Sequence, residues 1–222
     1  MTTDCKLPVL IFDFDGTIAD TFAPTMEILR TDYLRWGDRF HKRHTINQLR
    51  SLSIREIIKT IPGGWWKFIY LLLKAKHYIK THPESIKPYP GIVYTLRTLH
   101  DEGYLLFIVT SNQVASVERF LRQFDLDGIF TAVISTNGLW RKAKTLRRLL
   151  RSQQLSPTDC LYIGDEIRDI QACQKVYLPI VSVTYGFNSQ VGLAKYHPNF
   201  MIKKPTQLLT LLADKQRKSH CS

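Results

Sequence analysis

Two carboxylates, Asp13 and Asp15, follow an apolar run over residues 8–12 and stand directly before Gly16 and Thr17. A short apolar run of this kind is typical of a strand buried in a parallel sheet. Alternate residues of a strand share a face, so the pattern predicts that both acids point the same way. Ligands of open α/β sheets bind at the carboxyl ends of the strands, and the two acids are expected there.

Two like charges held this close raise the pKa of one carboxyl group unless a positive charge neutralises them. Mg²⁺ prefers oxygen ligands and suits a site that also holds a phosphate group. One carboxylate could then attack phosphorus as a nucleophile while the other moves protons. The alternative is a pair of acids at a solvated strand end, because short motifs often match by chance.

A hydroxyl and an amide follow a second apolar run. Residues 104–109 read as a buried strand, Ser111 and Asn112 come next, and a helix is expected over residues 114–124. Backbone N–H groups at the start of a helix and the Ser111 hydroxyl can bind an anion. Ser and Asn are also common helix caps, and both roles are compatible.

A basic helix is expected over residues 141–153, and Arg141, Lys142 and Lys144 stand at its start. Taken alone, each lysine is more typical of a solvated surface than of a binding site. The pattern by itself therefore assigns no role to either lysine.

A second group of acids lies in the stretch from Gly164 to Asp169, which contains Asp165 and Glu166. A carboxylate at a strand end, with a second one four residues later on the first helical turn, can bind Mg²⁺ directly and through water. The alternative is an acidic cap at the start of a helix.

Strands and helices alternate from residue 91 onward, which is typical of a doubly wound parallel sheet. Before that point, residues 46–61 and 65–79 show helical spacing of apolar residues, interrupted at residues 62–64. The sequence therefore predicts an α/β fold with a Rossmann-like sheet and a helical insertion. The expected domains are residues 1–21 and 90–222 for the α/β core and residues 22–89 for the insertion.

The chain has 222 residues, 44% of them hydrophobic, and a formal net charge of +12. Residues 30–87 contain thirteen Lys and Arg against four Asp and Glu, so most of the excess charge lies in the insertion. This favours anionic partners without distinguishing a phosphorylated metabolite from nucleic acid or a membrane. No signal peptide or transmembrane segment is expected. Four scattered cysteines favour a reducing cytoplasm.

The four stretches together resemble the motifs of the haloacid-dehalogenase-like (HAD) phosphohydrolases, in the phosphoglycolate-phosphatase-like branch that carries a helical cap. The resemblance implies a Mg²⁺-dependent phosphatase that forms an aspartyl-phosphate. Thr17 is usual in the phosphatase branch. Two departures are Arg141, where the family commonly has Gly, and Val176-Tyr177, where Ala-Gly is common.

The resemblance also implies roles for single residues. Asp13 is the expected nucleophile, Asp15 the acid and base, and Lys142 the catalytic lysine, with Lys144 as an alternative. The expected phosphate-binding residues are Ser111, Asn112 and Gly16. The expected metal ligands are Asp13, Asp15 through its backbone carbonyl, and Asp165, supported by Asp169.

The resemblance implies that residues 22–89 form a cap that closes over the site. The cap is expected to recognise a small anionic phosphorylated metabolite, with 2-phosphoglycolate as the first candidate. Alternatives are a phosphomutase or phosphotransferase of the same fold, or a basic protein that binds nucleic acid or a membrane. No nucleic-acid module is visible, and a monomer or homodimer is expected. The stretch Trp65–Leu73 could pack within the cap or on a second subunit, or touch a membrane or a partner.

Overall fold

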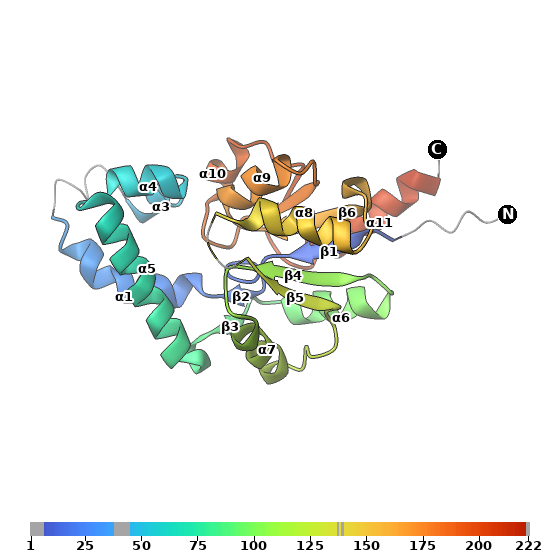
Figure 1. The fold of residues 1–222 in the computed structure, drawn as a ribbon, viewed down its shortest axis with the longest axis horizontal. Helices are drawn as coiled ribbons and strands as arrows, with labels where there is room; N and C mark the ends of the chain where they lie inside the picture. Colours follow the sequence, from blue (N-terminus) through green and yellow to red (C-terminus); the bar gives the residue numbers. More distant parts are fainter. Residues whose placement is uncertain (1–6, 38–44, 137, 139, 221–222) are drawn as a thin grey trace.

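The computed structural model describes residues 7–37, 45–136, 138 and 140–220. A six-stranded parallel sheet in the order β5-β4-β1-β6-β7-β8 forms its centre (Figure 1). The strands are β1 (Val9–Phe12), β4 (Leu106–Thr110), β5 (Ala132–Ser135), β6 (Cys160–Gly164), β7 (Ile180–Val183) and β8 (Phe200–Ile202). The chain moves outward from β1 in both directions along the sheet. The predicted doubly wound α/β fold is therefore confirmed.

Strand β1 shows how the apolar run positions the site. All four of its residues are buried, and they alternate between the two faces of the sheet. Leu10 and Phe12 belong to one apolar cluster, whereas Val9 and Ile11 belong to the other. Burial on both faces is typical of a parallel strand covered by helices. Asp13 is the next residue and therefore lies at the carboxyl end of the strand.

Helices cover both faces of the sheet. Helices α6 (Ile92–Asp101), α7 (Val114–Gln123) and α11 (Gln207–His220) contribute buried residues to the cluster that contains Leu10. Helices α8 (Lys142–Ser152), α9 (Ile167–Gln174) and α10 (Gln190–Ala194) contribute to the cluster that contains Val9. The first turns of α8 and α9 therefore lie on the same side of the sheet, where their polar residues can meet.

The helical insertion, residues 22–89, leaves and re-enters the core through a short antiparallel pair, β2 (Ala19–Asp20) and β3 (Lys87–Pro88). It contains α1 (Phe22–Leu34), α3 (Ile46–Leu49), α4 (Ile54–Thr60), α5 (Gly64–Thr81) and the 3₁₀ turn η1 (Pro83–Ser85). These helices lie to one side of the sheet in Figure 1. Residues 1–6 and 38–44 lie outside the described residues, and we keep the division at residues 21/22 and 89/90 as a proposal.

Two helices replace the single helical stretch expected over residues 46–61. The Thr45 and Ser53 hydroxyl groups each accept a hydrogen bond from the backbone N–H three residues later, and the side-chain oxygens of Gln48 and Glu56 accept one from the Thr45 and Ser53 backbone N–H groups. Each pair is a capping box, which starts a new helix. The break between α3 and α4 leaves residues 50–53 as a turn, and this turn faces the core.

The stretch Trp65–Leu73 lies entirely within α5 and has two kinds of surface. Leu71 is buried with Ile61, whereas Trp66 is 82% and Leu73 is 61% exposed. Lys67 and Lys74 of the same helix form ion pairs with Asp32 of α1 at 2.7 and 2.6 Å. Among the described residues, no helix is long and apolar enough to cross a membrane. One side of α5 thus packs in the insertion and the other meets solvent.

The departure at Val176-Tyr177 has a visible local consequence. Tyr177 has a φ of 57° just after α9, in the left-handed region where glycine is favoured. Its side chain is 87% exposed, while Val176 is buried. The left-handed turn therefore forms with a bulky residue in place of glycine, and this conformation destabilises the fold by about 1 kcal/mol.

Candidate active site

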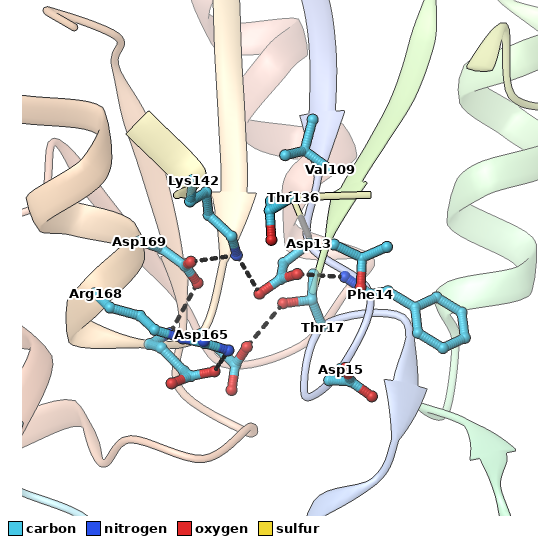
Figure 2. A network of polar contacts seen from close by, with 12 residues as sticks. Asp13, Phe14, Asp15, Thr17, Val109, Thr136, Lys142, Asp165, Arg168 and Asp169 are labelled. Carbon is cyan, nitrogen blue, oxygen red and sulfur yellow. Dashed lines mark hydrogen bonds and ion pairs between the residues drawn. The ribbon is translucent and has the colours of Figure 1, made fainter. Parts of the chain in front are cut away.

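Asp13 lies at the carboxyl end of β1 and is only 2% exposed. Its Oδ2 accepts a hydrogen bond from Lys142 Nζ at 2.7 Å, and its Oδ1 accepts one from the Phe14 backbone N–H at 2.8 Å. Both carboxylate oxygens are therefore oriented by the protein (Figure 2). Burial raises the pKa of Asp13, although the charge of Lys142 opposes the change.

Lys142, the first residue of α8, joins two carboxylates. Its Nζ lies 2.7 Å from Asp13 Oδ2 and 2.5 Å from Asp169 Oδ1, and the side chain is 4% exposed. Burial by itself lowers the pKa of Lys142, but the charges of Asp13 and Asp169 outweigh it and raise the pKa. The ammonium group therefore stays charged. Lys144, the alternative left open by the sequence, is exposed on the same helix.

Asp165 follows β6 and is fully buried. Its Oδ1 accepts a hydrogen bond from Thr17 Oγ1 at 3.1 Å, and its Oδ2 accepts one from the Phe187 backbone N–H at 2.6 Å. Burial, together with the charges of Glu166 and Asp169, raises its pKa well above the ordinary value. Thr17 from the first motif and Asp165 from the fourth are thus joined directly.

Glycines surround these carboxylates because no larger residue fits. A Cβ atom at Gly16 would lie 2.1 Å from Asp165 Oδ2, and one at Gly186 would lie 2.3 Å from the same atom. Gly16 also has a φ of +74°, which favours glycine. Its N–H donates to the Ala19 carbonyl at 2.9 Å. In this geometry the Gly16 amide serves the turn, and its expected phosphate contact stays a prediction.

Glu166 joins the cluster, although the sequence pattern predicts no role for it. One carboxylate oxygen from each of Asp13, Asp165 and Glu166 lies within 4.8 Å of the others. Glu166 also caps α9 together with Asp169, whose Oδ2 accepts from the Glu166 N–H at 3.2 Å. Its position next to Asp165 was the available signal. The acidic-cap interpretation and the ligand interpretation therefore apply to the same stretch.

Arg168 brings a second cation to this cluster. Its Nη2 donates to Glu166 Oε1 at 2.5 Å. Its Nε and Nη1 atoms are buried and have no hydrogen-bond partner among the described residues. Buried guanidinium donors are costly to leave unpaired, so these two groups are available to an anion or to water.

Asp15 lies apart from this cluster. Strand β1 ends at Phe12, so the alternation that placed Asp13 and Asp15 on one face does not extend to Asp15. The Asp15 carboxylate instead accepts a hydrogen bond from Asn112 Nδ2 at 2.8 Å and points away from Lys142 (Figure 2). Burial raises the pKa of Asp15, against the effect of the Asn112 hydrogen bond.

Ser111 and Asn112 lie between β4 and α7, as expected, but neither caps the helix. Helix α7 begins at Val114 with Gln113 as its N-cap and without a side-chain capping bond. Ser111 and Asn112 instead line a cavity together with Asp15. The structure thus brings the polar residues of the first two motifs to one cavity wall.

The cavity lies between the core and the helical insertion and has a volume of about 660 Å³. At the carboxyl ends of the strands it is lined by polar residues, and on the insertion side it is lined by α1, α3, α4 and α5. Its polar lining includes Asp15, Ser111, Asn112, Glu166 and Arg168.

The turn between α3 and α4 contacts the loop after β7, and we call this the 50–188 contact. Arg50 donates from Nη2 to the Gly186 carbonyl at 2.8 Å and from Nε to the Phe187 carbonyl at 3.1 Å. Asn188 donates from Nδ2 to the carbonyls of Arg50 and Leu52 at 2.8 and 3.0 Å. Neither residue had been singled out, because no local pattern marks such a pair.

The 50–188 contact continues into the acidic cluster. Asn188 Oδ1 accepts a hydrogen bond from the Ile167 backbone N–H at 2.9 Å, at the start of α9. The neighbouring Phe187 N–H is the one that binds Asp165. A single loop therefore touches both the insertion and the acidic side chains.

Comparison with known proteins places these features in a family context. The family model described as haloacid dehalogenase-like hydrolase matches residues 10–183. A phosphoglycolate phosphatase from Synechococcus elongatus is 28% identical over 211 residues, which cover 95% of this chain and 100% of that protein. The pyrophosphatase PpaX from Listeria welshimeri is 25% identical, covering 95% of this chain and 99% of that protein.

Solved structures agree at the level of the fold. A haloacid dehalogenase-like hydrolase from Streptococcus pneumoniae superposes with a TM-score of 0.71 at 19% identity, covering 93% of this chain and 98% of that one. A haloacid dehalogenase-like protein from Agrobacterium tumefaciens also gives a TM-score of 0.71, at 16% identity, covering 95% of this chain and 99% of that one.

Proposed function

The chain belongs to the haloacid dehalogenase-like hydrolase family, and from that premise we propose that it hydrolyses phosphate monoesters through an aspartyl-phosphate on Asp13. The observation that carries the proposal is the environment of Asp13. Its carboxylate is buried, oriented by two hydrogen bonds, and held 2.7 Å from a lysine that stays charged. A positioned carboxylate beside a fixed positive charge is suited to attack an anionic phosphoryl group.

In the first half of the reaction, an oxygen of Asp13 attacks phosphorus and the bond from phosphorus to the ester oxygen breaks. Asp15 gives its proton to that leaving oxygen. Because burial raises the pKa of Asp15, the protonated form that a general acid needs is favoured. Asn112 fixes the carboxyl group by its hydrogen bond. Lys142 disperses negative charge around Asp13.

In the second half, a water molecule attacks the aspartyl-phosphate and the bond between Asp13 and phosphorus breaks. Asp15, now ionised, takes the proton from that water and returns to its starting form. Ser111 and Asn112 at the cavity wall, and the unpaired N–H groups of Arg168, are the proposed partners of the phosphoryl oxygens. Inorganic phosphate and an alcohol are the products.

The residues of the cluster fit a divalent cation. Four carboxyl groups, those of Asp13, Asp165, Glu166 and Asp169, share this network with the two cations Lys142 and Arg168. An excess of buried negative charge and an all-oxygen donor set suit Mg²⁺. We propose that Asp13, Asp165 and the Asp15 backbone carbonyl hold it, with Glu166 close by. When bound, Mg²⁺ offsets negative charge at the reacting phosphoryl group.

The helical insertion is proposed to act as a cap, and the relatives supply the first substrates to try. One of them is called a phosphoglycolate phosphatase and another a pyrophosphatase. The substrate is proposed to be a small phosphorylated molecule, with 2-phosphoglycolate as the first ester to assay. A phosphomutase or phosphotransferase would instead pass the phosphoryl group to an acceptor other than water.

The test is phosphate release from 2-phosphoglycolate, from a panel of other phosphate monoesters and from the anhydride pyrophosphate, with and without Mg²⁺. We expect turnover that requires Mg²⁺ and falls by at least about 10³-fold in Asp13→Asn, because the nucleophile is lost. An unchanged thermal unfolding curve would show that the variant is folded. Equal turnover by Asp13→Asn and wild type, or no release from any ester, would overturn the proposal.

A further inference from the structure

The cavity is polar at one end, and most of the residues that line the rest of its wall are apolar. The polar end, at the strand termini, contains Asp15, Ser111 and Asn112. The insertion supplies apolar side chains from several helices to the same cavity. These are Met26, Leu29 and Tyr33 of α1, Ile54 and Ile57 of α4, and Phe68, Leu72 and Ala75 of α5.

The volume of the cavity is large for a two-carbon leaving group. At about 660 Å³ it falls in the range of pockets that hold drug-sized ligands, roughly 300–1,000 Å³. A glycolate leaving group would lie against the polar end and leave the walls from α1 and α5 in contact with water. An extended apolar leaving group would cover those walls and displace the water from them.

The charged side chains at the cavity suit a ligand that carries a negative charge. Arg30, Lys76, Lys80 and Arg119 line the cavity with exposed side chains, where they can attract a phosphate dianion from solution. The acids of α1 and α4, which are Glu27, Asp32 and Glu56, do not line the cavity, and Asp32 and Glu56 are hydrogen-bonded elsewhere. The described walls from α1, α4 and α5 are therefore mainly apolar, and the charged side chains that they contribute to the cavity are cations.

From this distribution we propose that the preferred substrates are phosphate monoesters whose leaving group is apolar, an alkyl or aryl alcohol of six or more carbons. The phosphoryl group binds at the polar end and the hydrocarbon lies along Met26, Leu29, Phe68 and Leu72. This inference rests on the proposed function and sharpens it. It ranks such esters above 2-phosphoglycolate.

The experiment compares kcat/KM for ethyl, butyl, hexyl and octyl phosphate and for 2-phosphoglycolate, each below its micelle concentration. Burying one methylene group strengthens binding about fourfold. We therefore expect kcat/KM to rise at least tenfold from ethyl to hexyl phosphate, and hexyl phosphate to exceed 2-phosphoglycolate. A flat or falling series, or 2-phosphoglycolate as the best ester, would overturn the inference and leave the phosphatase proposal intact.

Variants of α5 test whether the dependence of kcat/KM on alkyl chain length arises in the cavity. Ala75→Phe reduces the space between the helices, so the ratio of octyl to ethyl kcat/KM is expected to fall at least tenfold. The matched control is Leu73→Phe, because Leu73 is 61% exposed on the same helix and does not line the cavity. An equal change of the ratio in both variants, or no change in Ala75→Phe, would contradict the assignment.

A binding measurement separates failure of the inference from failure of the proposed function. Alkyl phosphonates cannot be hydrolysed at the carbon–phosphorus bond in this mechanism, so their affinity is independent of turnover. By calorimetry, octyl phosphonate is expected to bind at least tenfold more tightly than ethyl phosphonate. If no ester releases phosphate but this difference holds, the phosphatase proposal fails and the apolar site stands. Equal affinities would overturn the apolar site whatever the turnover.

Discussion

The acidic cluster and the helical insertion are built in different ways. Around Asp13 and Asp165, carboxylate oxygens have short hydrogen bonds, and glycines leave no room for side chains to shift. The described part of the insertion has a small apolar cluster, in which Ile61 and Leu71 are buried and the side chains around them are half-buried. Catalysis requires the reacting groups to be held in a fixed geometry. Recognition of varied leaving groups is compatible with side chains that are less tightly packed.

The 50–188 contact lies between these two regions and relates them. Asn188 binds the carbonyls of Arg50 and Leu52 on one side and the Ile167 N–H on the other. If the core is rigid and the insertion adaptable, substitutions should act differently in the cluster, at the contact and within the insertion. Three predictions test this, from the largest effect to the smallest.

The largest effect is expected for Lys142→Met in the cluster. The substitution leaves Asp13 and Asp169 buried without their shared cation, so the free energy of unfolding should fall by about 3–5 kcal/mol. Phosphatase activity should fall at least about 10²-fold, since the charge beside the nucleophile is lost. Urea unfolding and phosphate release measure the two effects.

The control for this prediction is Lys144→Met on the same helix, where the side chain is exposed. Its stability should change by no more than about 0.5 kcal/mol. Equal effects in the two variants would contradict the picture of a rigid cluster built on Lys142.

An intermediate effect is expected for Asn188→Ala at the 50–188 contact. Three hydrogen bonds are lost, and we expect a stability loss of about 1–3 kcal/mol. Because Asn188 adjoins the Phe187 N–H that orients Asp165, the Mg²⁺ concentration needed for half-maximal activity should also rise. Activity measured over a series of Mg²⁺ concentrations, together with urea unfolding, checks both.

Ser51→Ala is the matched control, because it removes only the hydrogen bonds of one hydroxyl group, to Ser189 Oγ and the Asn47 carbonyl. Its Mg²⁺ requirement should match that of the wild type. If Asn188→Ala alters stability without altering the Mg²⁺ requirement, the contact joins the insertion to the core but does not position Asp165.

The smallest effect is expected for Asp32→Asn, within the insertion. Burial raises the pKa of Asp32, but hydrogen bonds from Lys67 and Lys74 and their charges outweigh it, so the pKa is lowered. The ionised carboxylate therefore stabilises the fold fully above about pH 4 and loses this effect as the pH falls through the lowered pKa. Since both lysines are partly exposed, the loss at pH 7 should be about 1 kcal/mol.

Urea unfolding of the wild type and Asp32→Asn at pH 7, 5 and 3.5 checks this prediction. The stability difference should be equal at pH 7 and 5 and smaller at pH 3.5, with phosphate release at pH 7 unchanged. A loss of activity at pH 7 would indicate that the insertion is coupled to the chemistry more tightly than the comparison implies.

Local patterns in the sequence were sufficient to predict the sheet and the ends of its strands. The apolar run before Asp13, the one before Ser111 and the one before Asp165 each became a buried parallel strand. Periodicity and apolar runs are properties of neighbouring residues, so they can be recognised without the fold. For the same reason the site residues could be placed at the carboxyl edge of the sheet.

Other features depend on residues far apart in the chain, and only the tertiary structure decided them. Lys142 rather than Lys144 contacts Asp13, which is 129 residues away. The end of β1 at Phe12 separates Asp15 from Asp13. The 50–188 contact and the apolar cavity arise where the insertion meets the core. Such contacts depend on how helices pack in space, and a periodic pattern carries no information about which distant residue will lie opposite.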